Sequence, residues 1–202
     1  MRPVKLALTG TIGVGKSRAL ALFNRLGAHV LDCDDIVHAL LKGADKTITA
    51  KIIKTFGARV ARGGGVDRKT LGKQVFNDPT ARRKLERILH PVVIATLLRK
   101  ARAARGQVFV AEVPLLFETG LQKYFDASVA IYAPMSIIKK RVASRGYTTR
   151  DWQQRTAAQI PWSIKKSKAD FAINNSSDDK LTLKNHITRI YQACVAITKG
   201  GC

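Results

Sequence analysis

The stretch Gly10-Thr11-Ile12-Gly13-Val14-Gly15-Lys16-Ser17 decides the fold class of this chain of 202 residues. It matches G-x-x-x-x-G-K-[ST], the pattern of a phosphate-binding loop. An apolar run at 4–8 predicts a short buried strand before the loop, and apolar residues at 19–26 recur at helical spacing after it. Because strand, glycine loop and helix are the context that the motif requires, we interpret the stretch as a nucleoside triphosphate site rather than a chance glycine turn.

The residue types of this loop suit phosphate chemistry. Glycines let the backbone wrap closely around an anion, while backbone N–H groups and the amino end of the following helix supply positive potential. Lys16 can reach the β- and γ-phosphates, and the Ser17 hydroxyl can bind Mg²⁺. The sequence therefore predicts a bound nucleoside triphosphate together with Mg²⁺.

The charge of the chain is strongly positive. It has 36 Lys and Arg against 14 Asp and Glu, a formal net charge of +22. This balance fits either nucleic-acid binding or a site for phosphate-rich small molecules on a generally basic surface. Aromatic residues make up only 6% of the chain, and no RNA-binding signature is present. We therefore do not expect nucleic acid to be the physiological partner.

The composition also bears on location. With 46% hydrophobic residues the chain can bury a core, but no apolar run reaches the roughly 18 residues of a membrane span. The first residues lead directly into the first predicted strand, so we expect no signal peptide. Cys33, Cys194 and Cys202 lack metal-ligand spacing and are odd in number. We predict reduced thiols and a cytoplasmic protein without a membrane partner.

Short segments rich in Val, Ile and Phe alternate with helical patterns along the chain. Five of them are predicted strands: Val4–Leu8, His29–Asp32, Gln107–Val113, Ser128–Tyr132 and Phe171–Asn174. Such alternation predicts an α/β fold, with a mostly parallel sheet and helices on both faces. A last helix is predicted over Asp179–Ile197.

Two segments interrupt the alternation. Between the second and third strands, helical patterns occupy 46–56, 68–76 and 80–100. This insertion is either an acceptor-binding domain or a purely structural excursion. Residues 139–168 are rich in Lys and Arg, with Asp151 as the single acid. That segment fits a lid that closes over triphosphate, and the alternative is a solvated helix face.

Carboxylates follow two of the predicted strands. The second strand ends in Asp32-Cys33-Asp34-Asp35, at the sheet edge that borders the ligand crevice in doubly wound folds. Asp32 and Asp34 lie on one side of an extended segment and could accept or orient the proton of an attacking hydroxyl. The alternative is helix capping, which we assign to Asp35. Glu112 ends the third strand and is a candidate for holding Mg²⁺ directly or through water, although one acid after an apolar strand is a common pattern.

His90-Pro91 lies inside the insertion. A lone histidine is more often a packed residue than a catalyst. Because a proline disfavours helical backbone in the residue before it, His90 could instead turn toward a ligand.

Together these segments resemble the dephospho-coenzyme A kinase family, from residue 5 to about residue 177. The resemblance rests on the phosphate loop, Val30-Leu31-Asp32-Cys33-Asp34, Gly65-Val66-Asp67-Arg68, Leu89-His90-Pro91, Val113-Pro114-Leu115-Leu116-Phe117-Glu118, the series Arg141, Arg145, Arg155 and Gln159, and Asp170-Phe171-Ala172-Ile173-Asn174-Asn175. It implies a five-stranded parallel sheet of the P-loop kinase fold. The implied domains are a core (about 1–36, 105–138 and 169–202), a helical acceptor domain (about 37–104) and a lid (about 139–168).

The resemblance also implies an activity: transfer of the ATP γ-phosphoryl group to the ribose 3′-hydroxyl of dephospho-coenzyme A, the final step of coenzyme A biosynthesis. It makes Asp34 the general base, supported by Asp32 and Lys16. The implied ATP-binding residues are 10–17 with Arg141, Arg145 and Asn175, and the implied metal ligands are Ser17 and Glu112. The implied acceptor-binding residues are Asp32, Asp34, His38, Arg68, His90, Pro114 and Leu115.

Several positions depart from the family pattern. His38 stands where the family often has Arg, Thr11 where a glycine is usual, and Cys33 where alanine is usual. Neutral histidine is a weaker phosphate partner than arginine. Two other functions stay open from the sequence: a kinase of the same fold with another small-molecule or nucleotide acceptor, and a nucleic-acid-stimulated ATPase.

Overall fold

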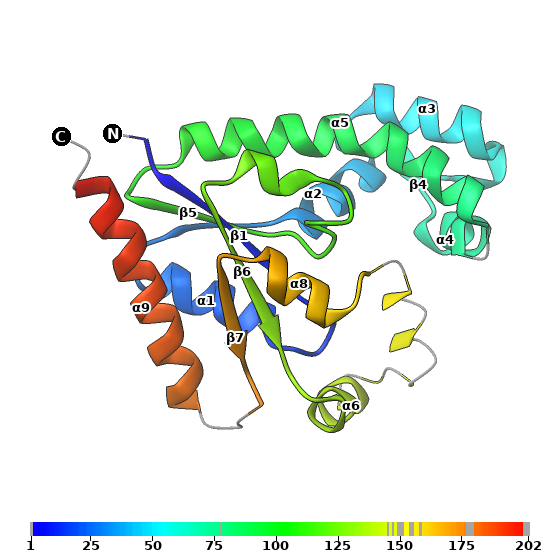
Figure 1. Cartoon of the computed structure of the whole chain (residues 1–202). Coiled ribbons are helices and arrows are strands. Elements are labelled where there is room, and N and C mark those ends of the chain that lie inside the picture. The colour runs from blue at the N-terminus through cyan, green and yellow to red at the C-terminus, as the bar shows by residue number, and fades with distance from the viewer. Residues whose placement is uncertain are drawn as a thin grey trace. The chain divides into compact units, whose positions relative to one another are not determined.

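A five-stranded sheet forms the centre of the fold, with strand order β2-β5-β1-β6-β7 (Figure 1). Its strands are β1 (Val4–Thr9), β2 (His29–Asp32), β5 (Val108–Glu112), β6 (Ala127–Tyr132) and β7 (Phe171–Asn174). β1 pairs in parallel with β5 and β6, and β6 pairs in parallel with β7. The predicted α/β fold with a parallel sheet is confirmed, and each predicted strand has its counterpart.

The computed structural model describes residues 2–76, 78–144, 146, 148, 152–153, 156–157, 159–176 and 180–199. These fall into two compact units, residues 1–31 with 101–202 and residues 32–100. Among the described helices, none combines the length and the apolar character needed to cross a membrane. Cys33 and Cys194 are buried, whereas Cys202 lies outside the described residues.

The first unit is built on the sheet. Its helices are α1 (Lys16–Arg25), α6 (Met135–Ala143), α8 (Trp162–Lys168) and α9 (Lys180–Lys199), with a 3₁₀ turn η3 (Leu121–Tyr124). α9 packs beside α1, as Figure 1 shows. β5 is buried along its whole length, as expected for a parallel strand covered on both faces. This unit carries the phosphate loop, residues 10–17.

The second unit is mostly helical. It contains α2 (Cys33–Ala39), a π-helical turn η1 (Leu40–Ala44), α3 (Lys46–Phe56), a 3₁₀ turn η2 (Ala58–Val60) and α4 (Arg68–Phe76), and α5 (Pro79–Ala103) begins in it. The sequence missed a small antiparallel hairpin of β3 (Ala61–Arg62) and β4 (Gly65–Val66). Its strands have two residues each, too few for a readable alternation.

Aspartates begin several helices of this unit. Asp45 accepts the Ile48 N–H at the start of α3, and Asp78 accepts the N–H groups of Thr80 and Ala81 at the start of α5. Those two backbone bonds lower the pKa of Asp78. The backbone at His90 does not depart from the helix: His90 is helical, and Pro91 lies within α5 on an exposed position. The acceptor-binding role of His90 stays a prediction.

Candidate functional site

The phosphate loop turns tightly at its glycines. Gly10 has φ +146°, and a Cβ there would lie 2.5 Å from the carbonyl oxygen of Ile131. Gly15 has φ +102°, and its Cβ would lie 2.5 Å from Nδ2 of Asn175. A side chain at either position would clash and would also strain the backbone, so the motif glycines are sterically required.

Protein donors hold the carbonyl oxygens of this loop. Lys16 Nζ donates to the Thr11 oxygen at 3.0 Å, Trp152 Nε1 to the Ile12 oxygen at 3.1 Å, and Asn175 Nδ2 to the Val14 oxygen at 2.7 Å. With the carbonyls engaged on the protein side, the N–H groups of the loop are left to face an anion. α1 begins at Lys16, within the loop, and has no acidic residue in its first turn to offset the positive end of its dipole.

Lys16 and Glu112 form a buried ion pair. Lys16 Nζ lies 3.5 Å from Glu112 Oε1, and each side chain is 7% exposed. The pair arises because β1 and β5 are in parallel register, with Leu8 beside Glu112. The structure thus brings two sequence-predicted site residues together at the carboxyl end of the sheet.

The side chains near the loop offer oxygen donors, the type of ligand that Mg²⁺ prefers. The Ser17 hydroxyl, exposed at the start of α1, and the Glu112 carboxylate are both hard oxygen donors. Among the described residues, no group of three His, Cys, Asp or Glu side chains could hold a metal ion. A magnesium ion here would therefore take most of its ligands from phosphate and water, as Mg²⁺ commonly does.

Asn175 ties the phosphate loop to two other elements. It is 6% exposed, and besides holding Val14 it donates its N–H to the Tyr132 oxygen at 2.7 Å. Its own carbonyl accepts a bond from Nη1 of Arg141, on α6, at 3.3 Å. Two predicted ATP-binding residues, Asn175 and Arg141, are thereby linked to the loop. The predicted Arg145 lies outside the described residues, as do Arg150 and Arg155.

In the second unit, Asp32 caps α2. It has extended backbone, and its Oδ1 accepts the Asp34 N–H at 2.9 Å. Our assignment of capping to Asp35 is therefore wrong, because the extended residue immediately before the helix is Asp32. Asp34 lies in the first turn of α2 with its side chain exposed.

His38 and Arg68 are hydrogen-bonded, with Arg68 Nη1 next to Nδ1 of His38. His38 follows Asp34 by four residues on α2, which places both on one helix face. Arg68 is the first residue of α4, where Asp67 binds the Thr70 hydroxyl and the Lys69 N–H. Those bonds lower the pKa of Asp67. Three predicted acceptor-binding residues thus lie in one unit: Asp34 in the first turn of α2, His38 in its last turn, and Arg68 at the start of α4. His90 is half-buried in α5.

The Pro114 carbonyl lies at the centre of a polar cluster that sequence reasoning missed. It accepts bonds from Thr9 Oγ1 at 3.3 Å, Gln159 Nε2 at 3.3 Å and Lys165 Nζ at 2.8 Å. Lys165 is 1% exposed and pairs with Glu118 Oε1 at 2.9 Å. Burial lowers the pKa of Lys165, and Glu118 opposes this shift. Lys165 resembles its exposed basic neighbours in the sequence, so only its burial reveals it.

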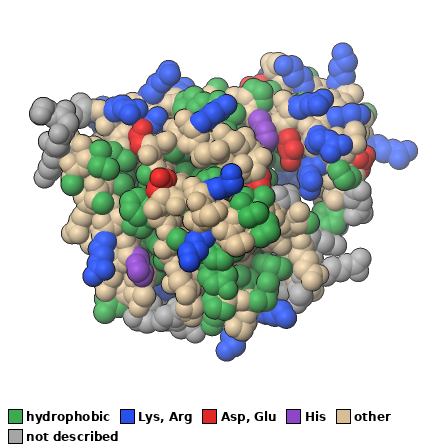
Figure 2. Space-filling model, in the orientation of Figure 1, with side chains coloured by type: hydrophobic (Ala, Val, Ile, Leu, Met, Phe, Trp, Pro, Cys, Tyr) green, Lys and Arg blue, Asp and Glu red, His purple; other side chains and the backbone are tan. Residues whose placement is uncertain are grey.

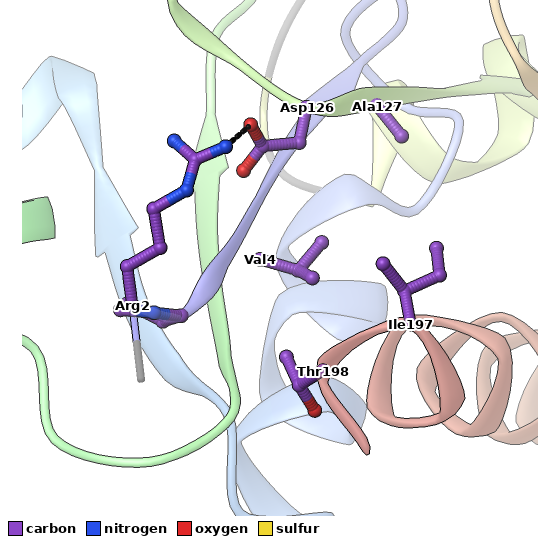
Figure 3. A pocket seen from close by; sticks show the side chains of 7 residues that line it. Arg2, Val4, Asp126, Ala127, Ile197 and Thr198 are labelled. Carbon is purple, nitrogen blue, oxygen red and sulfur yellow. Dashed lines mark hydrogen bonds and ion pairs between the residues drawn. The ribbon is translucent and has the colours of Figure 1, made fainter. Parts of the chain in front are cut away.

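A pocket of about 450 Å³ lies at the other end of the strands (Figure 3). Arg2 and Asp126 point toward one another across it and form an ion pair at 3.1 Å. It lies at the start of β1, whereas the phosphate loop follows the end of that strand. The lining residues are Arg2, Pro3, Val4, Asp126, Ala127, Ile197 and Thr198, and none of them is a predicted site residue.

Basic side chains are spread widely over the visible face of the molecule, with few acidic ones among them (Figure 2). This distribution agrees with the formal net charge of +22. A generally basic surface is one of the two interpretations that the composition allowed.

Comparisons with known proteins agree with one another. The family model described as dephospho-CoA kinase matches residues 4–180. A curated dephospho-CoA kinase of Aquifex aeolicus is 33% identical over 190 residues, which are 93% of this chain and 96% of that protein. One from Anaeromyxobacter dehalogenans is 41% identical over 176 residues, 85% of this chain and 83% of that protein.

Solved structures show the same likeness. A Thermus thermophilus protein has a TM-score of 0.82 at 28% identity, covering 96% of this chain and 98% of its own. The dephospho-CoA kinase of Campylobacter jejuni has a TM-score of 0.62 at 26% identity. The match covers 94% of this chain and 96% of that protein. A gluconokinase of Sinorhizobium meliloti, at 14% identity and a TM-score of 0.54, shares the fold.

Proposed function

This chain belongs to the dephospho-CoA kinase family, and on that premise we propose that it transfers the γ-phosphoryl group of ATP to the ribose 3′-hydroxyl of dephospho-coenzyme A. The products are coenzyme A and ADP. The family match does not favour a kinase with another acceptor or a nucleic-acid-stimulated ATPase.

The observation that carries the proposal is the phosphate loop with its buried Lys16–Glu112 pair, 3.5 Å apart. Lys16 is held by groups that a triphosphate can replace, the Glu112 carboxylate and the Thr11 carbonyl. When phosphate arrives, the ammonium exchanges these partners for the β- and γ-oxygens. Such positioned charge supplies most of the catalysis in phosphoryl transfer.

Mg²⁺ would supply positive charge that offsets the charge developing on the phosphates. Ser17 and Glu112 would hold it, Glu112 directly or through water. The loop N–H groups and α1 orient the triphosphate, and Arg141 adds positive charge from α6. Asp34 orients the acceptor hydroxyl and takes its proton, while Asp32 fixes the start of the helix that carries Asp34.

The rest of the assignment follows from the resemblance. Residues 37–104 form the acceptor domain and residues 139–168 the lid, on a core of about 1–36, 105–138 and 169–202. His38, Arg68, His90, Pro114 and Leu115 serve the acceptor. Arg145 and Asn175 join the ATP-binding residues. We place the enzyme in the cytoplasm, with no membrane and no nucleic acid as a physiological partner.

The test is ADP release by the purified protein with Mg·ATP, in the presence and absence of dephospho-coenzyme A. We expect strong dependence on the acceptor and a product phosphorylated at the 3′ position. In Asp34→Asn, loss of the general base should lower turnover by about 10²- to 10⁴-fold with ATP affinity unchanged.

Asp35→Asn is the matched control, because it removes the same charge from the next residue of the same helix turn. Its turnover should stay close to that of the unmodified chain. Near-normal turnover in Asp34→Asn would show that Asp34 is not the base. No acceptor dependence in the unmodified chain would refute dephospho-coenzyme A as the substrate.

A further inference from the structure

We propose that Lys165 is a positioning residue for phosphoryl transfer: it fixes the Pro114 carbonyl and engages Glu118, which leaves Lys16 available to the phosphates. The inferred effect on the acceptor rests on the proposed function. The inferred effect on ATP binding rests on the phosphate loop alone. Lys165 touches neither substrate in this account and acts through its neighbours.

The first argument is the geometry around the loop after β5. Lys165 Nζ donates to the Pro114 oxygen at 2.8 Å and to Glu118 Oε1 at 2.9 Å, so one ammonium binds both ends of the segment 114–118. Thr9, the last residue of β1, donates to the same Pro114 oxygen at 3.3 Å. Lys165 therefore anchors this segment beside the strand that leads into the phosphate loop.

The second argument is the distribution of buried charge. Among the described residues of the first unit, two ion pairs are buried, Lys16 with Glu112 and Lys165 with Glu118. Both lysines bind next to the end of β1: Lys16 donates to the Thr11 oxygen at 3.0 Å, and Lys165 donates to the Pro114 oxygen that also accepts the Thr9 hydroxyl. Burial lowers the pKa of Lys165, and the charge of Lys16 acts in the same direction. Each carboxylate has its own lysine, and Glu118 consequently does not need Lys16.

The third argument is what Glu118 would lose without Lys165. Its Oε1 also accepts the Ile160 N–H at 2.9 Å, but its Oε2 is buried and accepts no bond from the residues that the structure describes. A buried carboxylate without its cation is costly and attracts another positive charge. Among the described residues, Lys16 is the other buried lysine, and it lies next to the end of β1, so losing Lys165 would draw Lys16 away from phosphate.

The fourth argument is that burying the charged side chain of Lys165 costs more free energy than burying an apolar side chain of similar size. Apolar residues of similar volume often replace a buried ion pair without loss of stability. Lys165 links the end of β1, the segment 114–118 and α8. Its burial is thus better explained by the relative positions that it fixes for these three segments. We draw the functional consequence because Pro114 and Leu115, in the segment that it holds, are predicted acceptor-binding residues.

Three variants separate positioning from mere stability. Lys165→Met removes the donor and leaves Glu118 unpaired. Lys165→Met/Glu118→Gln removes the donor without leaving an unpaired charge, and Lys165→Arg keeps both charge and donor. Lys184→Met is the matched control, because Lys184 is an exposed lysine on α9 in the same unit and lies outside the proposed lid. The readouts are calorimetric titration with Mg·ATP, kcat and KM for each substrate, and Tm.

In Lys165→Met we expect ATP affinity and acceptor kcat/KM each to fall by roughly tenfold. In the double variant ATP affinity should return to near normal, whereas acceptor kcat/KM stays about tenfold low because the Pro114 carbonyl still lacks its donor. Lys165→Arg should recover most of both quantities, and Lys184→Met should change neither.

Two results would overturn the inference. One is a double variant with normal acceptor kcat/KM, and the other is normal ATP affinity in folded Lys165→Met. If the unmodified chain showed no acceptor-dependent ADP release, the proposed function would fail. The ATP titrations of the four variants would still decide whether Lys165 keeps Lys16 available.

Discussion

At the residue scale, the least usual feature is the contact between His38 and Arg68. Arg68 is a cation, so its N–H donates and His38 Nδ1 accepts. Only an imidazole nitrogen without a proton can accept in this way. His38 thus serves Arg68 as a hydrogen-bond acceptor, which an arginine at position 38 could not do.

We predict that His38→Leu raises KM for the acceptor by roughly threefold to tenfold, with kcat little changed, because Arg68 loses the partner that orients it. His38→Asn, whose amide oxygen can replace Nδ1, should stay close to normal. Steady-state kinetics at saturating ATP measure both effects.

His186→Leu on α9 is the control, because it makes the same change at an exposed histidine of the other unit. Equal KM values for His38→Leu and His38→Asn, whether normal or raised, would show that the hydrogen bond does not position Arg68.

At the scale of elements, the phosphate loop is held by segments that follow it far along the chain. β7 ends at Asn174, and the next residue, Asn175, binds Val14 while Arg141 on α6 binds Asn175. The strand–loop–helix unit therefore depends on β6, β7 and α6 for the shape of its loop. Position 15 accepts only glycine, because the Asn175 amide approaches it too closely for a Cβ.

We predict that Asn175→Ala destabilises the protein by about 1–3 kcal/mol, because the Val14 carbonyl is left without its donor. The loosened loop should also bind ATP roughly tenfold more weakly. Denaturant unfolding and a titration with Mg·ATP measure the two effects.

Asn174→Ala removes the same side chain from the exposed neighbouring position and should change neither quantity by much. The role assigned to Asn175 would be contradicted if its variant bound ATP normally.

At the scale of the whole molecule, the candidate site residues do not account for the formal net charge of +22. The positive side chains are widespread over the face shown in Figure 2. A surface of this kind attracts polyanions through a sequence-independent term that falls steeply with salt. Such binding would not by itself place nucleic acid in the catalytic cycle.

We predict that single-stranded RNA or duplex DNA leaves ATP hydrolysis without acceptor unchanged at about 0.15 M salt, because catalysis depends on the positioned acceptor hydroxyl. Any nucleic-acid binding should weaken by orders of magnitude between low and moderate salt. Measurement of ADP release with and without each polymer over a salt series tests both statements. A salt-resistant stimulation would instead favour the nucleic-acid-dependent ATPase.

Sequence patterns located the parts of the fold that neighbouring residues determine. The strands β2 and β7 and the helices α3 and α4 lie within the predicted bounds, because alternation, helical spacing and glycine breaks act over a few residues. The family resemblance was confirmed by the comparisons. The roles of Asp34, Arg141 and the other site residues stay predictions.

The sequence by itself determined the phosphate loop, the parallel sheet and the family. Only the tertiary structure decided which groups meet: Lys16 with Glu112, Val14 with Asn175 across 161 positions, and Pro114 with Lys165 across 51. Such pairs depend on strand order and on the packing of distant segments, which local propensity does not encode. Burial likewise distinguishes Lys165 from Lys166, because adjacent residues of a helix point to different sides.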